Sequence, residues 1–195
     1  MSCSQSLLIS QGHTFDYRFR VGTTAPVLKP ITGLGRTAPA TLTVPGHGLL
    51  QDWPYRIEQV TAPVELNSPE DDLAACYLAE VVNADTLRLS AVNGLGLKPL
   101  NGSAAVIRYF AHDDLTGLAA RLVVRRSPRG EVVATFGPGS GVRVDVALAS
   151  IDISLSAVVT AAISWRQATY ELELYDPSNA SLVYQLATGP ITVEA

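Results

Sequence analysis

The sequence predicts an all-β protein whose main element is a β-sandwich. Apolar and polar residues alternate with a period of two in several segments, which is typical of strands with one buried face. The aliphatic residues lean towards Val, Ile and Leu, which together with Thr suit a pleated sheet. The 15 Gly and 12 Pro gather between the alternating segments, where they predict turns. Short strands at this spacing favour a sandwich.

The clearest alternation lies near the start of the chain, where polar residues separate Phe15, Tyr17, Phe19 and Val21. The same period recurs in the segments 142–148 and 170–174. Four further strands, each bounded by Gly, Pro, Asn or Ser, are predicted at Leu118–Arg125, Glu131–Phe136, Leu182–Ala187 and Ile191–Glu194. A short helix is predicted within Ser154–Ile163, with Ser154 or Ser156 as its N-cap.

The middle of the chain has a different pattern. Residues Thr23–Pro39 are rich in Pro and Gly, and we expect them to form a linker. The strands that follow are shorter, and we place them at Thr41–Val44, Tyr55–Val60, Tyr77–Val82, Thr86–Leu89 and Ala104–Tyr109. They predict a compact small β-barrel or sandwich of roughly 70 residues, near the lower limit of independently stable domains. The segment Asn67–Asp72 is expected to be an exposed acidic loop.

Composition and charge exclude several classes of protein. With 47% hydrophobic and 16% charged residues, the chain is expected to pack a core rather than to be disordered. The net charge of −4, with no basic block, argues against direct nucleic-acid binding. No apolar stretch reaches the roughly 20 residues that cross a bilayer, and the first ten residues do not resemble a signal peptide. We therefore expect synthesis and assembly in a cytoplasm, without a membrane span.

The residues that could carry chemistry are scattered, so we expect no enzyme and no cofactor or metal site. His13, His47 and His112 have no ligand spacing to one another or to the two cysteines. His47, between two glycines, is interpreted as a turn residue. The run His112-Asp113-Asp114 could bind a hard cation through its carboxylates, but an exposed hinge is the preferred interpretation.

Two other patterns resemble catalytic or binding motifs only superficially. The segment Gly137–Gly141 lacks the Lys and Ser/Thr of a phosphate-binding loop, and no GxSxG elbow is present, so it is interpreted as a turn. Glu171 and Glu173 could form a glycosidase pair, but acids two residues apart on a strand usually form its solvated face. Trp53 and Tyr55 could stack on a carbohydrate, although an aromatic residue beside Pro more often packs a loop or an interface.

The two ends of the chain resemble an immunoglobulin-like module of bacteriophage tail and baseplate proteins. The resemblance rests on Gly12-His13-Thr14-Phe15, on Asp114-Leu115-Thr116-Gly117 before a strand that ends in basic residues, and on the turn Ser127–Gly130. It continues through a short helical turn at Leu155–Ala162 and the pattern Tyr170–Pro177. This resemblance implies an immunoglobulin-like β-sandwich formed by residues 1–28 and 111–195.

The middle segment interrupts that module and is similar to a small β-module repeated in phage tail fibres. The similarity rests on His47-Gly48-Leu49, on Asp52 before Tyr55–Ile57, and on Val82–Ser90 with Leu100–Gly102. It implies an inserted small β-barrel or sandwich domain over residues 29–110. Surface loops of a sandwich tolerate such insertions because their ends lie close together.

The function implied by the resemblance is that of a virion structural protein. We expect a tail or baseplate adaptor that holds other phage virion proteins in a symmetric assembly, as a homo-oligomeric ring of threefold, sixfold or twelvefold symmetry. Interface anchors are usually aromatic residues and arginines. The candidates are Trp53, Tyr55, Arg125, Arg126, Trp165 and Tyr184. The alternative is a phage protein that binds a receptor or glycan, or one that decorates the capsid.

Overall fold

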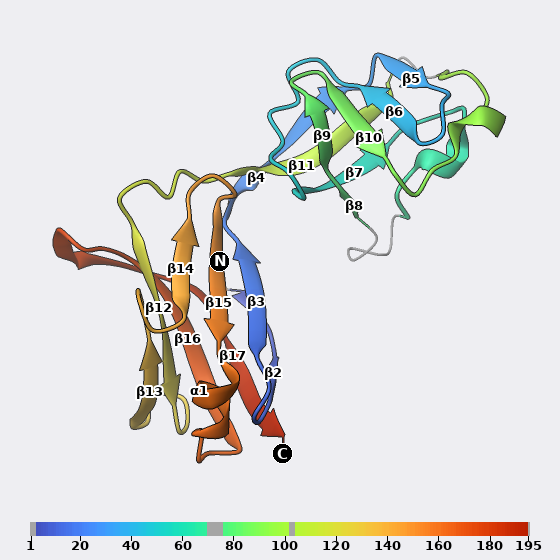
Figure 1. Cartoon of the computed structure of the whole chain (residues 1–195). Coiled ribbons are helices and arrows are strands. Elements are labelled where there is room, and N and C mark those ends of the chain that lie inside the picture. The colour runs from blue at the N-terminus through green and yellow to red at the C-terminus, as the bar shows by residue number, and fades with distance from the viewer. Residues whose placement is uncertain (1–2, 70–75, 102–103, 195) are drawn as a thin grey trace. The chain divides into compact units, whose positions relative to one another are not determined.

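The computed structural model describes residues 3–69, 76–101 and 104–194, and it confirms the all-β prediction. Within these ranges the only α-helix is α1 (Ala157–Ala161). The chain divides into two compact units (Figure 1). Unit 1 comprises Met1–Gly22 and His112–Ala195, and unit 2 comprises Thr23–Ala111.

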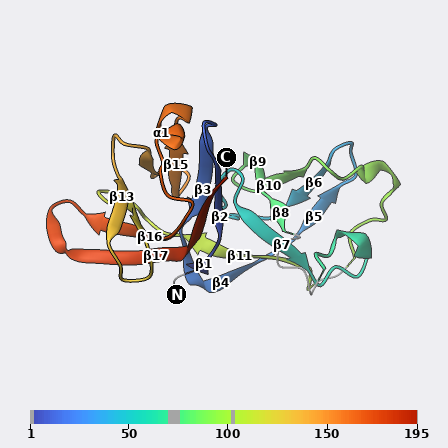
Figure 2. The same ribbon diagram turned by 90° about the horizontal axis from the view of Figure 1, so that it is seen from below.

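The larger sheet of unit 1 has the strand order β1-β17-β16-β12-β13, and β2 also pairs with β17. Its strands are β1 (Cys3–Ser4), β2 (Leu7–Ser10), β12 (Ala119–Arg125), β13 (Val132–Phe136), β16 (Gln167–Asp176) and β17 (Asn179–Glu194). β1 and β2 run parallel to β17, whereas β12, β13, β16 and β17 pair antiparallel. In Figure 2 the antiparallel pair β16 and β17 lies side by side along a long hairpin.

The smaller sheet of unit 1 has the order β14-β15-β3. Its strands are β14 (Val142–Asp145), β15 (Ser150–Leu155) and β3 (Phe15–Arg20). Apolar side chains from both sheets form one buried cluster, and the rings of Phe19 and Tyr170 meet across it with centroids 6.3 Å apart. Unit 1 is therefore a sandwich of two sheets.

Local sequence patterns account for most strands of unit 1. In β16, Tyr170, Leu172 and Leu174 are buried while the residues between them are partly exposed, as the period of two predicts. The predicted strands Leu182–Ala187 and Ile191–Glu194 are parts of one strand, β17, which continues through Gly189 and Pro190. On the other edge of β17, β1 pairs with the residues just before Gly189 and β2 pairs with those just after Pro190, and both pairings stabilise the strand there.

Two predictions in unit 1 are wrong in detail. The alternation at 142–148 does not form one strand, because β14 ends at Asp145 and the residues after it form a turn. The helix predicted over Ser154–Ile163 is shorter: Ser154 belongs to β15, and α1 begins after Ser156, whose hydroxyl accepts a hydrogen bond from the Val159 amide. The sheet extends across Ser154 because this residue pairs with Asp16 of β3.

Unit 2 contains two four-stranded sheets. One has the order β5-β6-β10-β9, from β5 (Gly33–Gly35), β6 (Ala40–Thr43), β9 (Glu80–Asn83) and β10 (Thr86–Leu89). The other has the order β4-β11-β7-β8, from β4 (Gly22–Pro30), β7 (Pro54–Glu58), β8 (Tyr77–Leu78) and β11 (Val106–His112). Two 3₁₀ turns, Val64–Leu66 and Gly94–Gly96, connect strands.

The linker predicted at Thr23–Pro39 is wrong, because β4 and β5 occupy most of this segment. Proline is tolerated here because β4 lies at the edge of its sheet, where a backbone N–H on the open side has no neighbouring strand to donate to. Part of the predicted acidic loop, 70–72, lies outside the described residues. Of its described part, Ser68 is buried and its hydroxyl accepts a hydrogen bond from the Ile57 amide.

Candidate functional site

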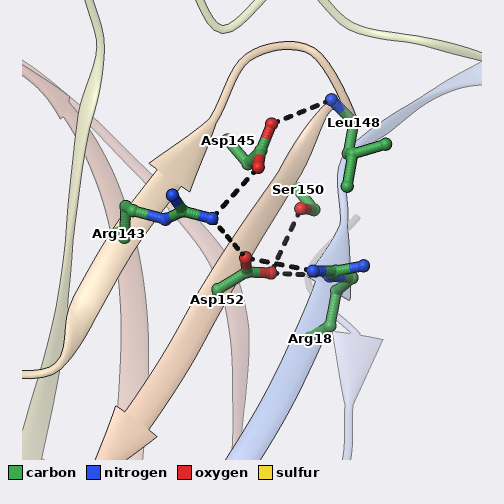
Figure 3. A network of polar contacts seen from close by, with 6 residues as sticks. All are labelled: Arg18, Arg143, Asp145, Leu148, Ser150 and Asp152. Atoms are coloured by element: carbon green, nitrogen blue, oxygen red, sulfur yellow. Dashed lines mark hydrogen bonds and ion pairs between the residues drawn. The ribbon is translucent and has the colours of Figure 1, made fainter.

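A row of charged side chains crosses the outer face of the β14-β15-β3 sheet (Figure 3). Asp152 of β15 lies opposite Arg18 of β3 and Arg143 of β14 in the strand register. Residues in register on antiparallel strands place their side chains on the same face. Arg18 donates to both carboxylate oxygens, with Nε–Oδ1 at 2.7 Å and Nη2–Oδ2 at 3.2 Å. Arg143 donates to Oδ2 at 3.2 Å, so one carboxylate joins two guanidinium groups.

Further contacts tie this row to the adjoining turn. Arg143 also donates to Asp145 at 3.1 Å, and the other oxygen of Asp145 accepts a hydrogen bond from the Leu148 amide at 3.1 Å. Ser150 donates to Asp152 at 3.2 Å. Figure 3 shows Arg18, Arg143, Leu148 and Ser150 around the carboxylates of Asp145 and Asp152. The turn after β14 is thus held against the same face of the sheet.

The electrostatics of the row favour the ionised form of Asp152. Its pKa lies below the ordinary value chiefly because Arg18 donates a hydrogen bond to it, with Arg143 and Ser150 adding to the effect against partial burial. The Arg143 side chain is 70% exposed, whereas that of Asp152 is 19% exposed. A well-exposed guanidinium is therefore held in position by carboxylates beneath it.

An open depression of about 1000 Å³ adjoins this row. Its lining includes Arg18, Arg143 and Asp152 together with the apolar residues Leu118 and Pro138. Apolar walls beside fixed, charged hydrogen-bond donors are typical of protein interaction surfaces. No nucleophile paired with a base lines the depression among the described residues.

Unit 2 has a depression of its own, of about 840 Å³, over the outer face of β7 and β11. Glu58 lies 3.6 Å from the guanidinium groups of both Arg56 and Arg108, and the exposed ring of Phe110 lines the same depression. This arrangement repeats in outline what unit 1 shows: one carboxylate between two arginines, beside an apolar surface.

The residues considered for chemistry have structural surroundings. Within the described part of the chain, no group of three or more His, Cys, Asp or Glu could hold a metal ion. His47 is buried in a turn, where Nε2 lies 2.9 Å from the Asn83 carbonyl and Nδ1 accepts the Leu49 amide at 3.0 Å. Asp114 accepts hydrogen bonds from the amide and hydroxyl of Thr116, which lower its pKa. The contacts of His47 agree with its interpretation as a turn residue.

Glu171 and Glu173 form cross-strand ion pairs rather than a catalytic pair. Arg125 of β12 lies 2.9 Å from Glu171, and Arg121 lies 2.6 Å from Glu173. Each pair joins residues of neighbouring strands β12 and β16 on the partly exposed face of the sheet.

Among the helices of the described residues, none is long and apolar enough to cross a membrane.

Two of the predicted interface anchors are buried, so their prediction as anchors is corrected and the alternative of carbohydrate stacking loses its support. Trp53 is 3% exposed and Tyr55 is 1% exposed. The indole Nε1 of Trp53 donates to the Phe110 carbonyl at 2.7 Å, and the ring of Tyr55 stacks on Tyr77 with centroids 5.7 Å apart. Both rings serve the core of unit 2, and neither presents a face to solvent.

The other four predicted anchors lie in unit 1 but do not form one patch. Arg125 bonds to Glu171 and to the Gly130 carbonyl, and Trp165 is half-buried against the core. Arg126 is exposed near Glu131, with 3.9 Å between the charged groups. Tyr184 is 53% exposed and lies beside Leu174, whereas Arg125 lies beside Thr169 at the other end of β16.

The Arg18–Asp152–Arg143 row escaped sequence reasoning because β15 was not predicted. The signal was present, since Ile151, Ile153 and Leu155 alternate with Asp152 and Ser154. The small residues that follow favoured a helix and masked this period of two.

Comparisons with known proteins do not identify a family for this chain. A scan against models of protein families gives no match, and a search of curated proteins gives none either.

Proposed function

We propose that this chain is a structural protein of a bacteriophage virion, an adaptor in the tail or baseplate that holds neighbouring virion proteins in a symmetric assembly. The observation that carries the proposal is the outer face of β14, β15 and β3, where Asp152 fixes Arg18 and Arg143 beside an open depression. Such a face can bind a protein partner and requires no reaction. The resemblance of Gly12–Phe15, Asp114–Gly117 and Tyr170–Pro177 to phage tail modules supports a tail or baseplate as the assembly.

The division into two units supports an adaptor. Each unit carries its own depression with arginines joined through a carboxylate, by Asp152 in unit 1 and by Glu58 in unit 2. Arginine is favoured at interfaces because its planar, weakly hydrated guanidinium forms directed hydrogen bonds. Two such surfaces on one chain suit a protein that contacts two neighbours.

The alternative of glycan recognition has lost its main support. It depended on stacking by Trp53 and Tyr55, and both rings are buried. Stacking requires an exposed aromatic face. The adaptor is therefore the proposal that the described surface favours.

The proposal can be tested by locating the protein in phage particles. Antibodies raised against the purified chain, coupled to gold, would be applied to particles from the source culture and viewed by electron microscopy. We expect label at the tail or baseplate, and the chain in immunoblots of disrupted, washed particles. Particles free of the chain in both measurements would refute a virion role.

A charge reversal tests the face itself. Arg143→Glu changes a side chain that is 70% exposed, so the fold should be kept while the partner surface is lost. In a complementation experiment we expect this variant to be excluded from particles. Arg166→Glu, at another exposed position of unit 1, is the matched control and should be incorporated normally. Equal incorporation of both variants would exclude this face as the contact.

A further inference from the structure

The hairpin of β16 and β17 leaves part of one strand edge open. From Ala187 onwards, the outer edge of β17 is covered by β1 and β2. Between Asn179 and Leu186, β17 pairs with β16 at Asn179 and at Val183–Gln185, and the register shifts before and after Val183–Gln185. No described strand pairs with the other side of this segment. The hairpin runs beyond the neighbouring strands β12 and β13 in both views (Figures 1 and 2). Its outer edge offers backbone N–H and C=O groups for a further strand.

The open segment also continues the apolar face of the sheet. Tyr184 lies opposite Leu174, whose side chain is in the core, so Tyr184 belongs to the same face. The period of two places Leu182 on this face too, within the irregular stretch between Asn179 and Val183 where β17 has no partner residue on β16. Yet Leu182 is 41% exposed and Tyr184 is 53% exposed. The core face of the sandwich thus extends into solvent along the hairpin.

The charge pattern of this edge is unusual for an open strand. No Asp, Glu, Lys or Arg occurs from Pro177 to Val193. Proteins usually protect an open edge with charged residues, Pro, β-bulges or a very short strand. This edge has two register irregularities but carries no charge and no Pro between Asn179 and Leu186. Here Leu182–Ala187 is instead an uncharged segment of high β-propensity, the kind that pairs readily with another strand. An uncharged edge of this kind indicates that another strand covers it in the working state.

We propose that the strand that covers it is the same segment of a second copy. The two strands pair antiparallel about a twofold axis that lies between the Val183 residues of the two copies. A twofold axis perpendicular to the sheet keeps each side chain on its own face, so residues pair only with residues of equal parity. The axis therefore passes midway between the two copies of one residue. With Val183 on the axis, Leu182 of each copy lies opposite Tyr184 of the other.

This register is self-complementary. It places two Leu182–Tyr184 pairs together on the apolar face and Ser181 opposite Gln185 on the other face, and cross-strand pairs of this kind stabilise a sheet. Because the segment has no charge, two copies meet without like-charge repulsion, which would oppose self-pairing at a charged edge. The absence of charge also leaves no electrostatic feature that would select a charged foreign strand. This inference does not depend on the virion assignment.

The test uses charge at the axis, where each copy contributes the same residue. Val183 is 42% exposed, so Val183→Lys and Val183→Glu should both fold, with the far-UV circular dichroism spectrum of the original chain. The mass of each protein would be measured by light scattering during gel filtration over a range of concentrations. We expect a dimer for the original chain and a dissociation constant roughly two- to fivefold larger for each variant alone, because like charges then face each other.

Mixing the two variants provides the decisive measurement. One copy with Val183→Lys and one copy with Val183→Glu place opposite charges at the axis, so an equimolar mixture should recover the dimer. Val158→Lys, at a position 80% exposed on α1, is the matched control and should remain dimeric. A monomeric original chain would overturn the proposal. A dimer that withstands both axis charges would also overturn it, as would a mixture that stays monomeric.

Discussion

Units 1 and 2 are both made of β-strands, but different interactions hold them together. In unit 1, β12 and β16 pair over seven residues, from Ala119 with Tyr175 to Arg125 with Thr169. The apolar side chains of its two sheets then meet in one continuous buried cluster. The long strand ladders supply hydrogen-bond partners for most backbone groups, so the core of unit 1 needs few hydrogen bonds from polar side chains.

Unit 2 has shorter ladders and more bonds from side chains to the backbone. β6 and β10 pair over four residues, and β7 and β11 pair over three. Asn67 bonds to both the amide and the carbonyl of Val60, at 2.9 and 2.8 Å, while Trp53 and His47 donate or accept in the interior. Short strands leave backbone groups that must find other partners when buried. In this unit, aromatic and polar side chains supply them.

The two tryptophans allow this comparison to be measured. Trp53 lies in unit 2 and Trp165 lies in unit 1, and the chain has no other tryptophan. Trp53→Phe therefore leaves a fluorescent reporter in unit 1, and Trp165→Phe leaves one in unit 2. Unfolding in urea can then be followed separately for each unit.

The largest effect is expected from a cavity in unit 1. Leu122 is fully buried and lies between Leu172 and Phe136 in the strand register. Leu122→Ala should lower the free energy of unfolding by about 2–5 kcal/mol, because it removes buried contacts and leaves a cavity. The Trp165 signal should report the loss. Val158→Ala at an exposed position should change stability by less than about 0.5 kcal/mol, and an equal effect of both would contradict a single continuous core.

A smaller loss is expected where β17 meets the start of the chain. A Cβ atom at Gly189 would collide with the backbone carbonyl of Gln5, beside the parallel pairing of β1 and β17. Gly189→Ala should therefore cost about 1–3 kcal/mol of unfolding free energy in unit 1, as overpacking does. Gly96→Ala in unit 2 is the control, since a Cβ there would meet nothing within 4 Å. Unchanged stability of the Gly189 variant would show that β1 is not held close to β17.

In unit 2, removal of a single hydrogen-bond donor should lower the free energy of unfolding. Trp53→Phe keeps an aromatic ring but removes the donor to the Phe110 carbonyl. Leaving this acceptor without its donor should cost about 1–3 kcal/mol. The loss would be measured by circular dichroism during urea unfolding, with Trp165→Phe, whose indole is half-buried in unit 1, as the comparison. If Trp53→Phe has the smaller effect, side-chain bonds are not what supports unit 2.

The smallest effect is expected in the charged row of unit 1. Asp152→Asn should lower stability at pH 7 by less than about 1 kcal/mol, because solvent screens the ion pairs at the surface: the side chains of Arg18 and Arg143 are 39% and 70% exposed. The pKa of Asp152 is depressed in the folded state, so its contribution is present above the ordinary pKa of about 3.8 and is lost as the pH falls towards the folded value. The difference between Asp152→Asn and the original chain should therefore shrink between about pH 5 and pH 2.

A matched substitution tests whether the two arginines are the reason that Asp152 stabilises unit 1. Asp16→Asn lies on the same face of the sheet, opposite Ser154 rather than an arginine. Its effect on the free energy of unfolding at pH 7 should be smaller than that of Asp152→Asn. A larger effect at Asp16 would mean that the Arg18–Asp152–Arg143 row contributes nothing particular to unit 1.

Sequence reasoning succeeded where the local pattern and the final burial agree. Alternation located β3 and β16, and Ser156 was one of two residues named as the cap of α1. It failed at β15, where small residues after the strand favoured a helix, and at β4, where Pro26 and Pro30 indicated a linker. In both cases a neighbouring strand that is distant in sequence decides the conformation, and local propensity gives no information about it.

The candidate surfaces show the same division. Arg18, Arg143 and Asp152 are unremarkable in the sequence, and only strand register brings them together. Trp53 and Tyr55 were suggested as surface anchors by their residue type, yet packing buries both. Residue type predicts what a side chain can do, whereas its accessibility depends on what else covers it.

The sequence by itself determined the all-β class, because a period of two is a local consequence of strand geometry. It also determined the absence of charge along Pro177–Val193. Only the tertiary structure decided that part of this segment forms an open edge, that β15 joins β3 to β14, and that two arginines share one carboxylate. These features depend on pairings between residues far apart in the chain, and the alternation within one strand carries no record of its neighbours.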